Sequence, residues 1–166
     1  GLKATIVDVG GELYIETTGS DVTVDRVGTV VGKSESGNVA VQRALGAVQA
    51  DVVNGNARII DGIGPVLLDL DGGNAEVSWA SLSGGVDSHL TNKTGSLTVR
   101  FPVTGPCRVD AKSLYGRIDS DLPAVNVADD RRTAQGPVNG GSRPVVHITA
   151  NGDIQLSGGS GASNAN

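Results

Sequence analysis

The stretch GNVAVQRALGAVQADVVNGNARIIDGIGPVLLDLDGGNAEVSW, residues 37–79, decides the fold. Within it a Gly-Asn pair recurs every 18 residues, at Gly37-Asn38, Gly55-Asn56 and Gly73-Asn74. A second glycine series interleaves with the same spacing, at Gly28, Gly46 and Gly64. A fixed period of this length is typical of repeat proteins, in which neighbouring units complete one another's core. Two turns per period predict two short strands in each coil.

The residues between the glycines alternate in polarity, as expected for strands with one buried face. We expect the turn residues after each strand, Gly followed by Asn, Asp or Ser, to supply positive φ angles. One set of inward residues is Leu13, Ile15, Val30, Val48, Ala50, Val52, Val66, Leu68, Leu70, Val86, Leu90, Cys107, Val109 and Ala111. The other is Val22, Val24, Val39, Val41, Ala57, Ile59, Ala75, Val77, Trp79, Leu97, Val99, Phe101, Ile118, Leu122, Ile154 and Leu156.

These patterns predict an all-β protein, a single-stranded β-solenoid with about 18 residues and two strands per coil. The buried rows would each take one residue from every successive turn of the chain. The repeat spans 1–158, continues past Gly84 with longer spacings, and lapses at 123–144, where we expect a loop excursion. Residues 159–166 form a tail rich in Gly, Ser and Asn that has nothing to bury.

Composition excludes several classes of protein. A protein with a formal net charge of −5 and a pI of about 4.8 is unsuited to binding phosphate backbones, so we expect no nucleic-acid partner. No run approaches the ~18 apolar residues of a membrane-spanning helix, so we expect no membrane span in this fragment. The chain holds no Met, position 1 included, which indicates a mature or trimmed chain and favours a secreted or cell-envelope location.

Few residues are suited to catalysis. His89 and His147 lie far apart on predicted strands, and His147 should point to solvent between inward Val146 and Ile148. Cys107 is alone in the chain, so it can form no internal disulfide, and we interpret it as a small buried hydrophobic residue. No nucleophile elbow, phosphate loop, zinc-spaced cluster or dinucleotide fingerprint occurs. The sequence therefore predicts no catalytic residues, cofactor or metal.

Three weaker patterns each allow a plain structural explanation. Asp69, Asp71 and Glu76 could offer oxygen ligands to calcium, but their spacing is not that of a calcium loop. Asn92-Lys93-Thr94 is a formal glycosylation acceptor of the kind that chance produces. Solenoid polysaccharide lyases use carboxylates and arginines on one strand face, although such charges more often form cross-strand ion pairs. The group of that kind here is Asp87, Arg100, Arg108, Asp110, Arg117, Asp119 and Asp121.

Two stretches resemble the repeat of the bacterial "putative adhesin" family of β-strand-repeat proteins. They are TGSLTVRFPVTGPCRVDAKSLYGRIDSDLP at 94–123 and VVHITANGDIQLSG at 145–158. The resemblance extends over most of the chain, although Gly-Asn stands at many turns where Gly-Asp is usual in the family. It implies a β-solenoid on a secreted or envelope protein of uncharacterised function, and it brings no catalytic residues.

The sequence thus favours a non-catalytic extracellular or cell-envelope scaffold, an adhesin-like module that contacts a protein or glycan at a cell surface. One alternative is a subunit of a self-assembling extracellular fibre, in which solenoid edges pair with one another. Another is a carbohydrate-active β-helix enzyme, which would need a groove with convergent carboxylates and stacking aromatics. Aromatic residues make up only 2% of the chain, so such a groove would be poorly supplied.

Overall fold

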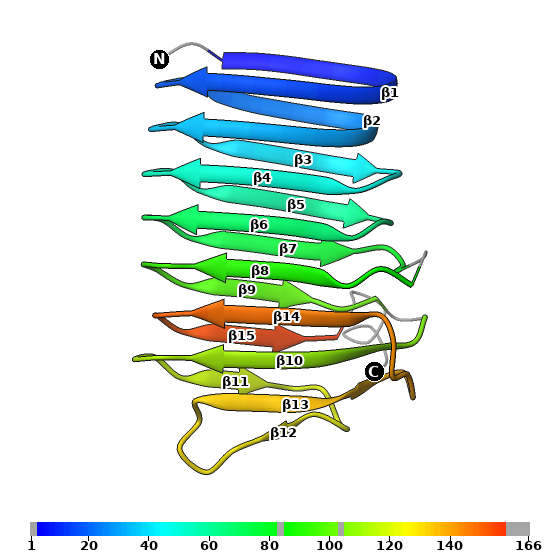
Figure 1. Ribbon diagram of the computed structural model, residues 1–166, viewed down its shortest axis with the longest axis vertical. Helices are drawn as coiled ribbons and strands as arrows, with labels where there is room; N and C mark the ends of the chain where they lie inside the picture. Colours follow the sequence, from blue (N-terminus) through cyan, green and yellow to red (C-terminus); the bar gives the residue numbers. More distant parts are fainter. Residues whose placement is uncertain (1–2, 83–84, 103–104, 159–166) are drawn as a thin grey trace, which may run out of the picture.

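The chain winds into two ladders of parallel strands that face each other across one core (Figure 1). This computed structural model describes residues 3–82, 85–102 and 105–158, and the described residues contain strands and no helix. The predicted all-β solenoid with about 18 residues per turn is confirmed. Residue 84 and the tail 159–166 lie outside the described residues.

Two long bent strands, β1 (Lys3–Thr18) and β2 (Asp21–Glu35), contribute one arm to each ladder. The first ladder continues through β3 (Val39–Ala44), β5 (Ala57–Gly62), β7 (Ala75–Trp79), β9 (Leu97–Arg100), β15 (Ile154–Ser157) and β11 (Ile118–Ser120). The second continues through β4 (Val48–Val53), β6 (Val66–Asp71), β8 (Ser88–Asn92), β14 (Val145–Ala150) and β10 (Cys107–Ser113).

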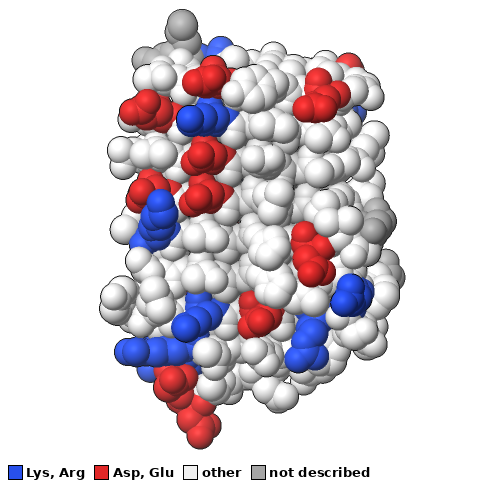
Figure 2. Space-filling view, in the orientation of Figure 1, with Lys and Arg blue, Asp and Glu red and all other residues white. Residues whose placement is uncertain are grey.

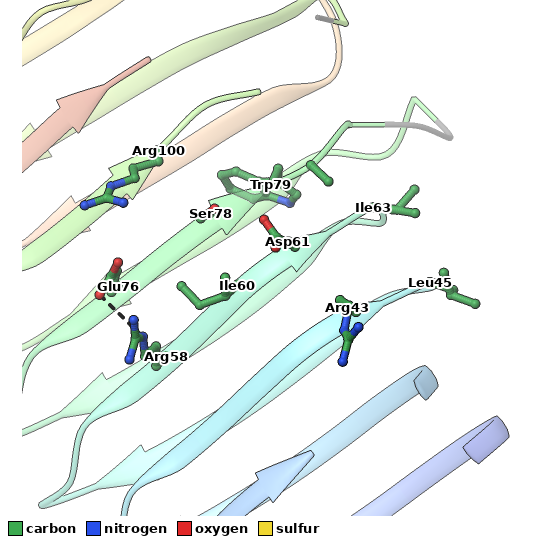
Figure 3. A pocket seen from close by; sticks show the side chains of 11 residues that line it. Arg43, Leu45, Arg58, Ile60, Asp61, Ile63, Glu76, Ser78, Trp79 and Arg100 are labelled. Carbon is green, nitrogen blue, oxygen red and sulfur yellow. Dashed lines mark ion pairs between the residues drawn. The ribbon is translucent and has the colours of Figure 1, made fainter. Parts of the chain in front are cut away.

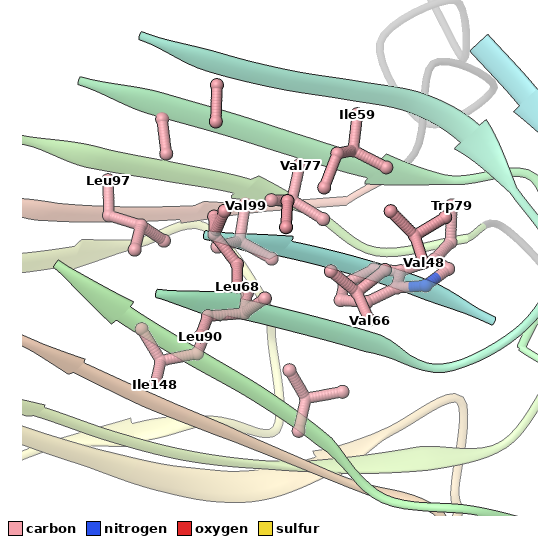
Figure 4. Close-up of a cluster of buried hydrophobic side chains, with 14 of the residues drawn as sticks. Val48, Ile59, Val66, Leu68, Val77, Trp79, Leu90, Leu97, Val99 and Ile148 are labelled. Carbon is pink, nitrogen blue, oxygen red and sulfur yellow. The ribbon is translucent and has the colours of Figure 1, made fainter. Parts of the chain in front are cut away.

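Each coil of the solenoid, with one strand in each ladder, is called a rung. The core is a set of aliphatic rows, and each row takes one residue from every rung. Val41 pairs with Ile59 and Ile59 with Val77, and all three are almost fully buried. In the facing ladder Leu68 pairs with Leu90, and Leu90 with Ile148 (Figure 4). Successive rungs lie about 4.8 Å apart, so each methyl group contacts the rungs before and after it. The predicted stacking of inward residues is confirmed.

Val86 was wrongly assigned to the core. Its side chain is 55% exposed, and Ser88 occupies the inward position in that rung instead. The repeat there is longer, since Leu68 pairs with Leu90, 22 residues on. The position two residues after the turn glycine, Val86, therefore precedes the strand β8, which begins at Ser88. The hydroxyl of the buried Ser88 accepts a hydrogen bond from the Val66 N–H at 3.0 Å.

The rungs do not follow the order of the chain. Strand β14 lies between β8 and β10, and β15 lies between β9 and β11 (Figure 1). The rows therefore do not take one residue from every successive turn, as the sequence had led us to expect. Most inward positions in every rung carry Val, Ile, Leu or Ala, so the pattern does not specify which rung neighbours which.

The segment 123–144, where a loop excursion was expected, closes one end of the solenoid. It contains β12 (Asn126–Val127) and β13 (Thr133–Val138), and β13 pairs antiparallel with β10. Three of its side chains, Val125, Ala134 and Val138, are buried against the last rung. The strand β13 thereby covers the outer edge of β10, and an exposed strand edge of this kind promotes aggregation.

The turn glycines are needed for close approach more than for positive φ. A Cβ on Gly55 would lie 2.0 Å from the carbonyl oxygen of Gly37, and one on Gly73 would lie 1.9 Å from that of Gly55. Gly19, Gly73 and Gly95 have the positive φ expected from the sequence, whereas Gly37 and Gly55 do not. At these two turns the residue before the glycine has the positive φ instead, Ser36 before Gly37 and Asn54 before Gly55.

The asparagines after these glycines form a hydrogen-bonded column. The Asn38 side-chain oxygen accepts from the Asn56 backbone N–H at 2.9 Å, and the Asn56 oxygen accepts from Asn74 N–H at 2.9 Å. The column starts on Asp21 and ends on the Ser96 N–H. Each turn is thereby tied to the next, which fixes the register of the rungs.

We predict that Gly55→Ala destabilises the protein by about 1–3 kcal/mol, because the added methyl group must displace the backbone of the neighbouring turn. A matched control is Gly11→Ala, where an added Cβ would meet no atom within 4 Å. Urea unfolding of both variants and the parent measures the difference. Equal stability of the two variants would show that the turns do not pack as closely as described.

Candidate functional site

The two histidines stack against each other on the outer face of the second ladder. His147 of β14 pairs with His89 of β8, and their ring centroids lie 4.8 Å apart at an interplanar angle of 11°. The sequence placed them far apart, and they meet because β14 inserts beside β8. His147 is half-buried, with 39% of its side chain exposed, and faces outward as expected.

Two carboxylates flank His147 and complete what we call the histidine cluster: His89, His147, Asp87 and Asp110. Asp87 Oδ2 lies 3.9 Å from His147 Nε2, and Asp110 Oδ2 lies 3.8 Å from Nδ1. In the described part of the chain, no hydroxyl or thiol group hydrogen-bonds to either imidazole. The carboxylates of the cluster instead hold strands, because Asp87 Oδ1 accepts from the Val145 N–H at 2.8 Å.

A groove of about 760 Å³ opens on the outer face of the first ladder (Figure 3). Arg43, Arg58 and Arg100 line it together with Asp61 and Glu76. The remaining wall is largely apolar, formed by Leu45, Ile60, Ile63, Trp79 and Ala80, with Ser78 between. We call this concave surface the arginine groove.

The groove lies where a column of outward corner residues ends. Asp8, Arg26, Arg43 and Asp61 occupy equivalent bends on successive rungs, each with φ between 53° and 59°. Among the described residues, the bends at the ends of β7 and β9 carry no non-glycine residue of positive φ. Arg43 and Asp61, the last two residues of this column, line the groove. Sequence analysis missed this site, although the spacing of these four residues, 18, 17 and 18, follows the repeat.

The three arginines differ in how closely each one pairs with a carboxylate. Arg43 donates from Nε to Asp25 Oδ1 at 2.8 Å, and this pairing lowers the pKa of Asp25 and raises that of Arg43. Arg58 lies 3.6 Å from Glu76, a longer and weaker contact. In the structure as described, Arg100 is exposed and has no ion-pair or hydrogen-bond partner for its guanidinium group. Arg100 is thus the groove cation most available to a ligand.

The carboxylate and arginine group singled out from the sequence is divided between the two faces. Asp87, Arg108 and Asp110 lie on the second ladder or its edge, whereas Arg100 lies on the first. The others sit on the first ladder near the cap: Arg117, Asp119 and Asp121. Asp119 pairs with Arg131 at 2.8 Å. The group therefore does not converge on one site.

The possible calcium ligands also separate. Asp69 and Asp71 belong to β6 in the second ladder, whereas Glu76 belongs to β7 in the first. Asp71 lies 3.5 Å from Lys93, and Glu76 faces Arg58. Within 3–82, 85–102 and 105–158, no group of three or more His, Cys, Asp or Glu side chains is arranged to hold a metal ion.

Asn92 and Cys107 are structural residues. Asn92 is 1% exposed, and its side-chain nitrogen donates to the carbonyl oxygens of Gly73 and Ser96, so a glycan could not be attached without unfolding the turn. Cys107 is fully buried, as the sequence indicated, and burial raises the pKa of its thiol to about 11.

Comparisons with known proteins assign no family. No protein-family model and no curated protein matches the chain. Its structure is similar to that of "a putative cell adhesion protein" from Clostridium sporogenes, with 10% identity and a TM-score of 0.39 over 95% of this chain and 92% of that one. The described residues form no helix long and apolar enough to cross a membrane.

We predict that Asp87→Ala weakens the docking of β14 by about 1–2 kcal/mol, because the Val145 N–H loses a charged acceptor. Asp69→Ala, which removes an exposed carboxylate from the same face, should be nearly neutral. Hydrogen exchange of the β14 amides reports the difference. Similar exchange rates in both variants would contradict a docking role for Asp87.

We also predict that Cys107 is inert towards Ellman's reagent at pH 8 in the folded protein and fully reactive in 6 M guanidinium. At that pH the thiol stays protonated, since its pKa of about 11 lies well above it, and no solvent reaches the sulfur. Rapid labelling of the native protein would mean that β10 is not held in the core.

Proposed function

We propose that the protein is a non-catalytic, adhesin-like binding module on a secreted or cell-envelope protein, with the arginine groove as its ligand-contact surface. The observation that carries this proposal is the exposed, unengaged Arg100 in a groove lined by other cations and apolar side chains. Such a combination of a concave apolar surface with a few polar groups is what ligand sites require.

The rigidity of the scaffold supports this assignment. Rungs on both sides of the groove are tied by backbone ladders and by the asparagine column, so its side chains project from fixed strands. A preformed surface loses little conformational entropy on binding. The groove is open rather than enclosed, which suits a segment of an extended glycan or polypeptide better than a small molecule.

The nature of the groove also indicates what the ligand carries. Arg43 is engaged by Asp25 and Arg58 faces Glu76, which leaves Arg100 to receive an external anion. Guanidinium groups bind carboxylates and sulfates through paired hydrogen bonds. We therefore expect a carboxylated or sulfated glycan, or an acidic stretch of a surface protein, and not a neutral chain.

The two alternatives are less well supported. A fibre built from solenoid edges needs an open edge at both ends, and β13 covers one of them. A carbohydrate-active enzyme would need stacking aromatics, but Trp79 is 3% exposed and donates its ring N–H to the Gly64 carbonyl oxygen. Release of reducing sugar from a polysaccharide panel would revive the enzymatic alternative.

The test is binding to a panel that contains heparin, alginate, polygalacturonate, a poly-glutamate peptide and neutral dextran. We expect binding to one or more anionic members, none to dextran, and an affinity at least about tenfold lower for the double variant Arg58→Ala with Arg100→Ala. Arg117→Ala, which removes an exposed arginine of the same ladder outside the groove, is the matched control.

Binding that is the same in the double variant and in the control would overturn the role of the groove. Failure of the parent to bind any anionic member would overturn the proposed ligand class. Circular dichroism of each variant, with the β-sheet spectrum and melting temperature of the parent, shows that a loss of binding is not a loss of fold.

A further inference from the structure

The strand β1 lies at the end of the solenoid opposite β13. In the part of the chain described here, β1 pairs with β2 alone, so one edge of this 16-residue strand has no partner. The inward residues Ile6, Val9, Leu13 and Ile15 pack on the core but stay only partly buried. A long, unprotected edge above a half-covered core is a template for strand addition.

The backbone groups that face this edge can be identified from the rungs below. In those rungs inward residues donate to the following rung, as in Val30 N–H to the Ala47 carbonyl at 3.0 Å and Val48 N–H to Pro65 at 3.0 Å. Alternate residues of a parallel strand bond to opposite neighbours. By the same register, the outward residues Glu12, Tyr14 and Glu16 direct their backbone groups to the free edge.

Charge indicates what the edge accepts. Along one outward row of the second ladder, Glu16 pairs with Lys33 and Lys33 with Asp51, so acidic Glu16 has a basic neighbour in the next rung. The alternation of sign ends there, because Asp51 pairs with Asp69. Figure 2 shows acidic and basic side chains in columns on this face. The next position beyond Glu16 is suited to a cation. On the first arm, Asp8 pairs with Arg26 at 2.7 Å in the same manner.

We propose that the free edge of β1 binds an extended segment of another polypeptide, added parallel to β1, with apolar residues at every second position and basic residues opposite Asp8 and Glu16. A second copy of this chain fits poorly. In a head-to-tail arrangement, β1 of one copy would meet the opposite end of the other copy, which β13 covers. In a head-to-head arrangement, two acidic β1 edges would face each other. The inference is independent of the arginine groove.

The probe is a fluorescent peptide with the sequence of residues 21–35, DVTVDRVGTVVGKSE, which already pairs with the other edge of β1 in this pattern. Its Arg26 and Lys33 would face Asp8 and Glu16. We expect saturable binding by fluorescence anisotropy. For the peptide with Arg26→Glu and Lys33→Glu, we expect an affinity lower by a factor of about five or more. Equal binding of both peptides would overturn the charge preference.

Two protein variants test the edge itself. Tyr14→Pro removes one N–H that faces the free edge and leaves the β1–β2 hydrogen bonds of Leu13 and Ile15 in place, so peptide binding should be lost. Tyr14→Ala keeps that N–H, and binding should persist. Both variants should retain the spectrum of the parent and its ligand binding at the groove, which separates failure here from failure of the proposed function.

Light scattering of the protein alone decides between partners. We expect a monomer at micromolar concentration. A dimer that Tyr14→Pro abolishes would identify a second copy as the occupant and overturn the proposal. Peptide binding that survives Tyr14→Pro in a folded protein would place the contact elsewhere and overturn it as well.

Discussion

Close stacking of turn backbones is the constraint on which the rest of this structure depends. Rungs about 4.8 Å apart leave no room for a side chain where two turns meet, so glycine occurs there at every coil. A Cβ at Gly37, Gly55, Gly73, Gly95 or Gly152 would overlap a carbonyl oxygen of the neighbouring turn, at 1.9 to 2.2 Å. With the turns in contact, the asparagine column and the aliphatic rows follow in register. The core is built mainly from Val, Ile, Leu and Ala, with Trp79, Phe101 and Cys107 also buried in it.

The same uniformity explains what the sequence could and could not predict. Periodic glycines and period-two alternation were sufficient for the fold, because each depends on local geometry that recurs in every rung. Rung order depends on which edges pair, and all edges have similar patterns. The repeat therefore does not predict that β14 lies beside β8. In the glycine series itself, Gly116 and Gly152 stand 36 residues apart, twice the repeat. The capping strand was missed because its pairing is antiparallel.

Both candidate sites arise where the repeat is broken. The histidine cluster exists because an out-of-order rung brings His147 next to His89. The arginine groove lies at the end of the column of corner residues, and Arg43 and Asp61 line it. Neither could be found by searching for catalytic motifs, since the residues come from different rungs. On a scaffold of regular rungs, irregular positions are where function can be placed without loss of the core.

The central claim is that residues 145–157 form a rung between 88–100 and 107–120. Pairwise cysteine substitution tests it, because neighbouring rungs fall within the 4.4–6.8 Å Cα separation of a disulfide and alternate rungs do not. We predict ready oxidation of Thr91→Cys with Thr149→Cys, and of Thr149→Cys with Lys112→Cys, the pairs that stand side by side. The pair Thr91→Cys with Lys112→Cys should stay reduced. A disulfide in that last pair, with none in the first two, would show that the rungs stack in chain order and would contradict the account.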